Sequence, residues 1–443
     1  MIYTKSIMMV ILRKLFKNPI FYAFLLIALV HIVFACNSPV GSFAGDTSTY
    51  TSEYDPGFRT PVYPVFTNFI SVFSGDSWSD WFPAVGFVQR IIFDASIILF
   101  FFTVRMITKK PFLLAVATFL YGAAPGIFSW SYIVMTECFA IIEGILLLFF
   151  TLKYLRNHRI FDAAAIGLVI LLTIMTRPSS LYLIVAYFVF WCAQLILMRK
   201  NKAKELLRSV YVGCLSMVLV VCCVFCYCAN INAKFGVFSI SKVSYINNVL
   251  TVIDSGLYRK SDNLEIIEAI GEPQKPQDIY DVLWGKLLVR FSGAELRAFS
   301  DAVIRENRIT YYKILFYKAL NWGAEPIVDS YLISTHDLWD YSSWAIAIMP
   351  FTFGAIYIVV SIGMLFVLSR FVREKKLNLL LLVILLCICG NLATMVLAAP
   401  YEPARLFVAS IPILMSGVIY VIDVVLSKKH LFKYELTGKN IVK

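Results

Sequence analysis

The sequence predicts an all-α polytopic membrane protein, and three observations support that prediction. The chain has 443 residues, of which 60% are hydrophobic. Only 15% are charged, whereas a soluble globular protein carries roughly 25%. Several apolar runs reach the ~20 residues that an α-helix needs to cross a bilayer. The bilayer therefore takes the place of a conventional core in any account of this fold.

The apolar runs give about ten candidate transmembrane helices. In chain order they cover residues 20–37, 82–104, 111–129, 133–152, 160–176, 179–198, 209–229, 344–368, 377–398 and 406–426. The first run follows a basic stretch, as the apolar part of a signal peptide would. Because further spans follow it, we expect it to be an uncleaved first transmembrane helix.

The placement of Lys and Arg predicts the orientation. With the N-terminus in the cytoplasm, the cytoplasmic pieces hold most of the basic residues; they are 1–19, 105–110, 153–159, 199–208, 369–376 and 427–443. The short loops on the other side carry only Arg59, Arg177 and Arg405. Short basic loops remain in the cytoplasm, so the predicted topology is N-in/C-in. The net charge of +12 then reflects membrane orientation, and no nucleic-acid partner is needed to explain it.

Three parts follow from this topology. Residues 1–229 form an N-terminal transmembrane module with spans one to seven, and its first outer loop is 38–81. Residues 230–343 combine polar turns such as GEPQKPQD with helical stretches such as IYDVLWGKLLVRF. We expect this segment to be a small, mainly α-helical extracytoplasmic domain between spans seven and eight. Residues 344–443 form a C-terminal transmembrane module with spans eight to ten.

Polar residues collect in the extracytoplasmic loops. Four loops that are distant in the sequence contribute Asp46, Glu53, Asp55 and Arg59; Glu137; Arg177; and Glu402 with Arg405. Ionisable groups at membrane depth are costly and usually functional. A carboxylate can take the proton of an acceptor hydroxyl as general base, and arginines offer bidentate donors to a phosphate leaving group. The set favours transfer of a sugar from a polyprenyl phosphate to an acceptor hydroxyl.

The first outer loop also carries a recognisable pattern. It contains G-D-x-x-x-Y at residues 45–50 and R-x-P-x-Y-P at residues 59–64, and TE and TRP follow at 136–137 and 176–178. Over residues 20–200 this resembles the GT-C superfamily of membrane glycosyltransferases, which includes protein O-mannosyltransferases and the aminoarabinose transferase of lipid A. The resemblance implies an inverting transfer from a polyprenyl- or dolichyl-phosphate sugar. It also implies a site on the outer face of the cytoplasmic membrane or in the lumen of the endoplasmic reticulum, and we expect the bacterial cytoplasmic (inner) membrane with an outward-facing site.

The resemblance implies roles for individual residues. Asp46 matches the proposed general base, and we expect Glu137 to be a second catalytic residue. The expected substrate-binding residues are Tyr50, Glu53, Asp55, Arg59, Tyr63, Arg177, Glu402 and Arg405. The expected partners are membrane lipids, the lipid-phosphate sugar donor, and a glycan, lipid or protein acceptor. No resident cofactor and no metal ligands are predicted, and the need for a divalent metal is left open.

Simpler structural roles for these residues stay open at this point. Asp46 could cap a turn, the tyrosines could belong to an interfacial aromatic belt, and the arginines could reach the interface only as anchors. Arg90 and Asp94 lie one helical turn apart in the second span, where we expect a buried pair. Glu143 could join that pair.

Two other functions are alternatives to the glycosyltransferase. A flippase or transporter of a lipid-linked sugar would place its binding residues near the bilayer midplane, whereas the charges here collect at one surface. An O-antigen-type polymerase or ligase would carry its residues in the large loop 230–343. The position of the richest motif in the first outer loop favours the glycosyltransferase.

Overall fold

The computed structural model of the chain describes nine stretches: residues 18–37, 47–50, 57–75, 78–200, 204–241, 245–273, 276–321, 378–397 and 408–427. All regular secondary structure of more than one residue within these stretches is helical. Several predicted features lie outside the described residues, namely the span 344–368 and the site candidates Asp46, Glu53, Asp55, Glu402 and Arg405.

Nine apolar helices in the described stretches match nine of the expected spans. They are α2 (Pro19–Asn37), α4 (Trp78–Ile107), α5 (Pro111–Ala123), α7 (Glu137–Asn157), α8 (Ile160–Thr176), α9 (Tyr182–Lys200), α10 (Lys204–Phe235), α19 (Leu379–Leu397) and α21 (Ile411–Ser427). Among the described residues, α2, α4, α7, α9 and α10 contain segments long and apolar enough to cross a membrane, and the others are shorter. The chain is therefore an integral membrane protein.

The third expected span is shorter than its apolar run. The run continues to residue 129, but α5 stops at Ala123, and Ala124 is extended with ψ of 119°. The residue before a proline avoids the α region, and Pro125 follows. The chain then makes two short helical turns, α6 (Pro125–Phe128) and η2 (Ser129–Ser131), before α7 begins at Glu137. This interruption places the start of α7 next to the ends of neighbouring helices.

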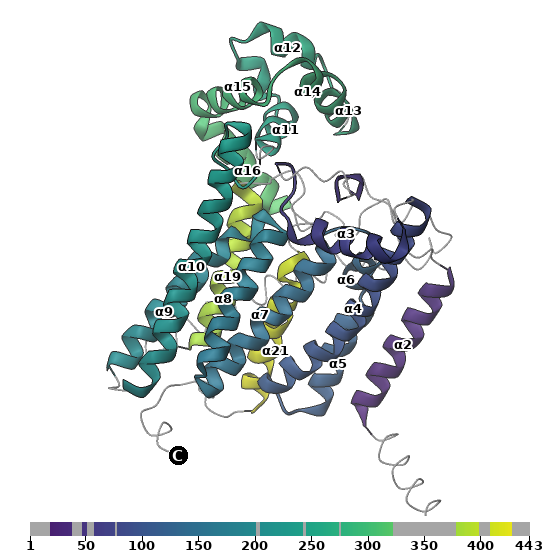
Figure 1. The fold of residues 1–443 in the computed structure, drawn as a ribbon, viewed down its shortest axis with the longest axis vertical. Helices are drawn as coiled ribbons and strands as arrows, with labels where there is room; N and C mark the ends of the chain where they lie inside the picture. Colours follow the sequence, from purple (N-terminus) through teal and green to yellow (C-terminus); the bar gives the residue numbers. More distant parts are fainter. Residues whose placement is uncertain are drawn as a thin grey trace, which may run out of the picture.

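Helix α7 lies at the centre of the bundle. It packs against α4, α8 and α21, and also against the short turn η7 (Val408–Ser410). About it the other helices stand roughly side by side, with α2 at one edge, where it packs on α5 (Figure 1). Both ends of α7 can therefore meet residues from several distant parts of the sequence.

The first outer loop contains a helix that the sequence analysis does not predict. Helix α3 (Val62–Ser74) runs crosswise over the ends of the spanning helices (Figure 1). One face is buried and includes Tyr63 and Thr67. The other face exposes large apolar side chains, namely Val65, Phe69, Val72 and Phe73, each at least 60% accessible. An apolar surface of this kind fits contact with lipid better than contact with water, so α3 is suited to lie at the membrane surface.

A separate group of helices, the distal helical unit (residues 245–321), continues beyond the end of α10. Its main helices are α11 (Ile246–Asp254), α12 (Leu264–Ile270), α13 (Pro276–Val282), α14 (Leu288–Arg290), α15 (Gly293–Glu306) and α16 (Arg308–Asn321). The unit has an apolar core of its own. A capping box formed by Ser292 and Glu295 starts α15. The unit stands above the end of the bundle that carries α3 (Figure 1), hereafter the α3 end.

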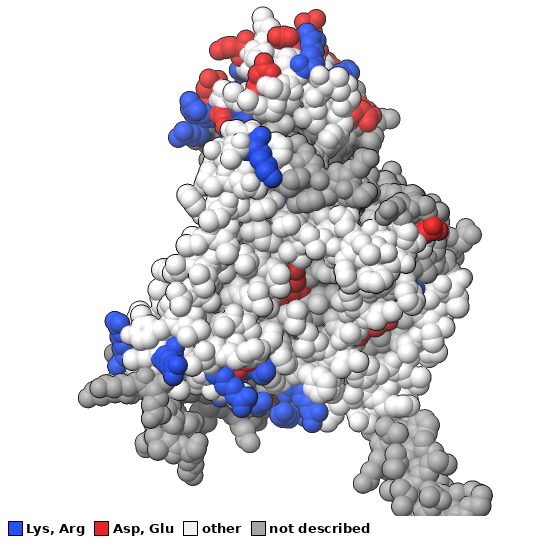
Figure 2. Space-filling model, viewed as in Figure 1, with Lys and Arg blue, Asp and Glu red and all other residues white. Residues whose placement is uncertain are grey.

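Charged side chains divide between the two ends of the molecule. Figure 2 shows acidic and basic residues mixed on the distal helical unit, a nearly uncharged band below it, and a cluster of Lys and Arg at the opposite end. Arg105 in the last turn of α4 and Arg156 in the last turn of α7 belong to that basic end. The uncharged band is the part of the surface suited to lipid.

Candidate functional site

A buried ion pair joins two helix ends at the α3 end of the bundle. Arg177 Nη2 donates to Glu137 Oε1 at 3.1 Å. The side chains are 7% and 0% exposed, respectively. Removing one partner of such a pair is strongly destabilising, because the other charge then stays buried without compensation. Two candidates that the sequence offers 40 residues apart are thus brought into direct contact.

The local sequence explains why these two residues meet. Glu137 is the first residue of α7, where a carboxylate is favoured by the partial positive charge of the helix N-terminus. Arg177 directly follows α8 and has an extended backbone, with φ of −147° and ψ of 108°. Pro178 imposes that conformation on the residue before it. The TRP sequence therefore stops α8 where its arginine can reach Glu137.

The first outer loop joins this pair through a backbone contact. Thr60 Oγ1 donates to the carbonyl oxygen of Thr176 at 3.1 Å, across 116 residues of sequence. Because Arg59 precedes Thr60 and Arg177 follows Thr176, two of the three arginines expected to bind phosphate flank one hydrogen bond. The structure thus brings two of the predicted cationic residues into the same region.

Arg59 is held in place by the turn that follows Asp46. Its Nε donates to Thr49 Oγ1 at 2.8 Å, and Thr49 belongs to the 3-10 turn η1 (Thr47–Tyr50). The guanidinium carbon also lies 5.2 Å from the ring centroid of Tyr50 and 5.0 Å from that of Phe58. Cation–π contacts of this kind orient a guanidinium without neutralising it. The positive charge of Arg59 is thus kept at a fixed place beside η1.

The two expected substrate-binding tyrosines are buried in the support of the loop. Tyr50 and Tyr63 are 1% and 0% exposed, and their rings meet edge to face at 4.9 Å. Burial raises the pKa of the Tyr63 phenol well above its ordinary value, and Tyr50, Cys138 and Glu137 add to the rise. The hydroxyl therefore stays protonated, and it donates a hydrogen bond to Gln89 Oε1 at 2.7 Å. A substrate contact for either tyrosine stays a prediction.

Gln89 is a supporting residue that sequence reasoning missed. It is fully buried in α4. Its Oε1 accepts from Tyr63, and its Nε2 donates to the carbonyls of Trp130 at 2.9 Å and Ile133 at 2.6 Å. It therefore ties α3 to the irregular stretch before α7. The available signal is a lone amide within the apolar sequence GFVQRIIF.

Gln89→Leu is expected to destabilise the protein by about 1–3 kcal/mol, because it removes the acceptor of the buried Tyr63 hydroxyl and the side-chain donor to the Trp130 carbonyl. The measurement is the thermal unfolding midpoint in detergent micelles. Gln194→Leu is the matched control. Gln194 is equally buried, but within the described part of the chain neither of its side-chain polar atoms has a hydrogen-bond partner, so the same substitution there should be neutral or stabilising. Equal losses in the two variants would contradict the supporting role of Gln89.

The turn η7 approaches the same helix from the C-terminal part of the chain. A side-chain carbon added at Gly144 of α7 would lie 2.8 Å from the carbonyl oxygen of Ala409. Asn391 Nδ2 in α19 donates to Ser410 Oγ at 2.8 Å, which holds η7 from its other side. Residue 408, where η7 begins, is three positions after Arg405. The described chain thus returns to α7 immediately after the PYEPAR sequence.

Gly144→Ala is expected to reduce stability by about 1–3 kcal/mol, because overpacking against a backbone oxygen forces helix and turn apart. Loss of activity should accompany it if the segment before η7 contributes to the site. Gly285→Ala is the control, since a side-chain carbon there would meet nothing within 4 Å. Thermal unfolding and sugar-transfer rate are measured for both. Wild-type behaviour of Gly144→Ala would show that η7 can move away without consequence.

The prediction of a buried pair between Arg90 and Asp94 is wrong. Asp94 Oδ1 instead lies 2.8 Å from His31 Nδ1 on α2, while Arg90 lies over the ring of Tyr132, 4.2 Å from its centroid. The His31 ring is fixed from its other side by the Gly122 carbonyl, 2.7 Å from Nε2. A spacing of one turn puts Arg90 and Asp94 on one face of α4, but a histidine from a second helix, α2, is the partner of Asp94.

Glu143 does not join that group either. It lies on α7 at the other cluster, with Oε1 2.5 Å from Thr176 Oγ1. Among the described residues, no group of three or more His, Cys, Asp or Glu side chains is placed to share a metal ion.

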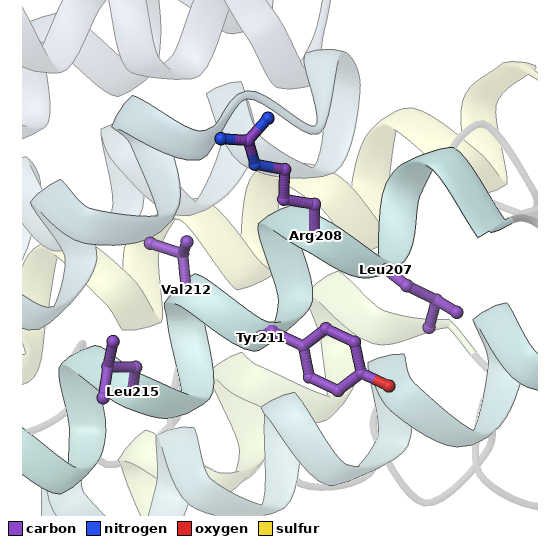
Figure 3. Close-up of a pocket in the computed structure, with 5 residues that line it drawn as sticks. All are labelled: Leu207, Arg208, Tyr211, Val212 and Leu215. Carbon is purple, nitrogen blue, oxygen red and sulfur yellow. The ribbon is translucent and has the colours of Figure 1, made fainter.

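A hollow of about 540 Å³ lies on α10 but away from the Glu137–Arg177 pair. Leu207, Arg208, Tyr211, Val212 and Leu215 line it, with the Arg208 guanidinium directed away from the Tyr211 ring (Figure 3). Tyr227, further along α10, contacts the Arg59 carbonyl at 3.4 Å. Nineteen helical residues at 1.5 Å each separate Arg208 from Tyr227, roughly 28 Å. The hollow is therefore too distant to belong to the candidate site.

Comparisons with known proteins find a weak similarity of structure. No protein-family model and no curated protein matches the chain. A crystal structure of ArnT from Cupriavidus metallidurans in the apo state overlaps 90% of this chain and 76% of its own, with 13% sequence identity and a TM-score of 0.34. A likeness this weak carries no argument about site or substrate, so the function has to be argued from the residues themselves.

Proposed function

We propose that the protein is a GT-C-type glycosyltransferase that moves a sugar from a polyprenyl phosphate to an acceptor hydroxyl. The single observation that carries the proposal is the meeting of the first outer loop with the Glu137–Arg177 pair. Arg59 and Arg177 flank the Thr60–Thr176 hydrogen bond, at the end of the bundle where α3 presents its apolar face. A lipid phosphate at the membrane surface would lie at the depth expected for these arginines.

The chemistry asks for a base and for positive charge. Asp46 directly precedes η1, the turn that holds Arg59, and acts as the general base. It takes the acceptor hydroxyl proton while the acceptor oxygen bonds to the anomeric carbon from the face opposite the phosphate. The bond from that carbon to the phosphate oxygen breaks, and its electron pair leaves with the phosphate. The guanidiniums stabilise the departing anion.

Glu137, which the sequence analysis expects to be a second catalytic residue, acts in this scheme by positioning Arg177. Its Oε1 accepts from Arg177 Nη2, which fixes the guanidinium at the end of α8, where the proposed phosphate would bind. Glu402, Arg405, Glu53 and Asp55 complete the proposed substrate-binding set. The α3 end faces away from the cytoplasm, because the basic residues at the opposite end are those expected on the cytoplasmic side.

The test is reconstitution with lipid donors. The purified protein in nanodiscs should transfer or release sugar from a polyprenyl-phosphate sugar, and mass spectrometry of co-purified lipids should reveal the natural donor. Arg208→Ala, in the remote hollow, serves as the unaffected control. Movement of a lipid-linked sugar across proteoliposomes without cleavage of the sugar–phosphate bond would favour the flippase instead.

A further inference from the structure

One buried carboxyl group close to the site has no role in the scheme above. Glu143 projects from α7 and is 6% exposed. Its Oε1 lies 2.5 Å from Thr176 Oγ1, while its Oε2 is buried and has no hydrogen-bond partner among the described residues. Thr176 is the residue that accepts Thr60 through its carbonyl and precedes Arg177. Glu143, through its contact with Thr176, therefore helps to fix the backbone beside Arg177 and the hydrogen bond beside Arg59.

Counting hydrogens at Thr176 indicates where the proton lies. Thr176 Oγ1 is within hydrogen-bond distance of two oxygens, the Glu143 carboxyl at 2.5 Å and the Leu172 carbonyl at 2.9 Å. A hydroxyl has one hydrogen to donate, and a carbonyl can only accept. When the threonine bonds back to the carbonyl four residues earlier, as helix threonines commonly do, the contact with Glu143 needs a hydrogen from Glu143.

The charge distribution points to the same state. Among the described residues no Lys, Arg or His forms an ion pair with Glu143, and Arg177 pairs with Glu137 instead. An ionised carboxylate buried without a counter-charge is very costly, and such a group takes up a proton. We propose that Glu143 is a neutral carboxylic acid that donates to Thr176 and thereby positions the end of α8. A single proton on Glu143 supplies the hydrogen for the contact with Thr176 and removes the buried negative charge.

The consequence for the site rests on the proposed function. With Glu143 neutral, Glu137 and Arg177 balance each other, and Glu143 adds no negative charge to repel a phosphate. The hydrogen bond to Thr176 fixes the residue before Arg177 and the carbonyl that receives Thr60. Glu143 is thus a positioning residue, since nothing places it in contact with the substrate.

Infrared spectroscopy of the full-length protein in nanodiscs tests the protonation state without any substrate. The difference between wild-type and E143Q spectra at neutral pH should contain the C=O band of a protonated carboxylic acid, with a shift in D₂O. E295Q is the matched control. Hydrogen bonds from Ser292 hold the pKa of the Glu295 carboxyl below its ordinary value, so that difference should contain only carboxylate bands. Carboxylate bands alone for E143Q would overturn the proposal.

Transfer rates test the positioning role. An amide can donate to Thr176 as a carboxylic acid does, so E143Q should keep kcat within about twofold. E143L cannot donate and should lower kcat about 10- to 100-fold, the loss expected when a reacting group is misplaced. Equal losses in E143Q and E143L would refute positioning by a neutral donor. If wild type transfers no sugar from any polyprenyl phosphate, the proposed function fails, whereas the infrared result stands or falls separately.

Discussion

Arg177→Met is expected to abolish transfer and to destabilise the protein, and the two losses have different causes. Glu137 is 0% exposed and would be left charged and buried without its partner, at a cost of about 3–5 kcal/mol. Transfer should fall about 100- to 1,000-fold beyond any loss of folded protein, as when one donor to a developing anion is removed. Thermal unfolding and transfer per folded molecule measure the two effects separately.

The double variant E137Q R177M separates a phosphate contact from a structural link. Removing both charges ends the burial of a lone carboxylate, and replacing a buried pair with uncharged residues is often neutral in stability. Stability should therefore return towards wild type, while transfer should stay low because the guanidinium is still missing. Recovery of transfer together with stability would show that the pair only joins α7 to α8. Arg208 lies near the start of α10, far from the contact of Tyr227 with Arg59. Arg208→Met should therefore affect neither stability nor transfer.

The transmembrane helices were predictable because lipid imposes a length and an apolar composition on each of them. Helix α3 was not, although it has a regular pattern. Its polar and aromatic residues Tyr63, Thr67 and Ser71 face the protein, and Val72 and Phe73 face outward. The pattern is the reverse of that of a soluble surface helix, because the outward side is suited to lipid. Only the position of α3 across the bundle shows which face is which.

The site was predictable where a charge interrupts an apolar run. Glu137 and Arg177 stand out for that reason, and the structure pairs them. Gln89 carries no charge, so its signal as a lone amide in an apolar run is weaker, and the sequence does not show that it holds Tyr63. Contacts between distant segments could not be predicted at all. The approach of Ala409 to Gly144 depends on how two parts of the chain pack, and a glycine within an apolar helix does not by itself reveal which segment packs against it.

Asp46→Asn is expected to reduce transfer about 100- to 10,000-fold, the contribution of a positioned general base. Asparagine keeps the size of the side chain and its hydrogen-bonding oxygen, but it cannot take the acceptor proton. The substitution also addresses the alternative that Asp46 caps a turn, because asparagine serves in turns as well as aspartate does. A residue needed only for the turn would tolerate Asp46→Asn, so retained folding with lost transfer identifies the base.

Glu53→Gln and Asp55→Asn provide the comparison within the same loop. If Asp46 is the base, these two variants should affect binding of the donor or acceptor, seen as a raised KM, more than kcat. The three proteins are compared in nanodiscs at equal folded concentration, with the polyprenyl-phosphate sugar varied up to saturation so that KM and kcat are both obtained. Wild-type transfer by D46N together with a collapse of kcat in E53Q or D55N would move the role of base to that other carboxylate. Since η1 follows Asp46 directly and its Thr49 holds Arg59, base and phosphate-binding arginine would in either case belong to one short loop at the membrane surface.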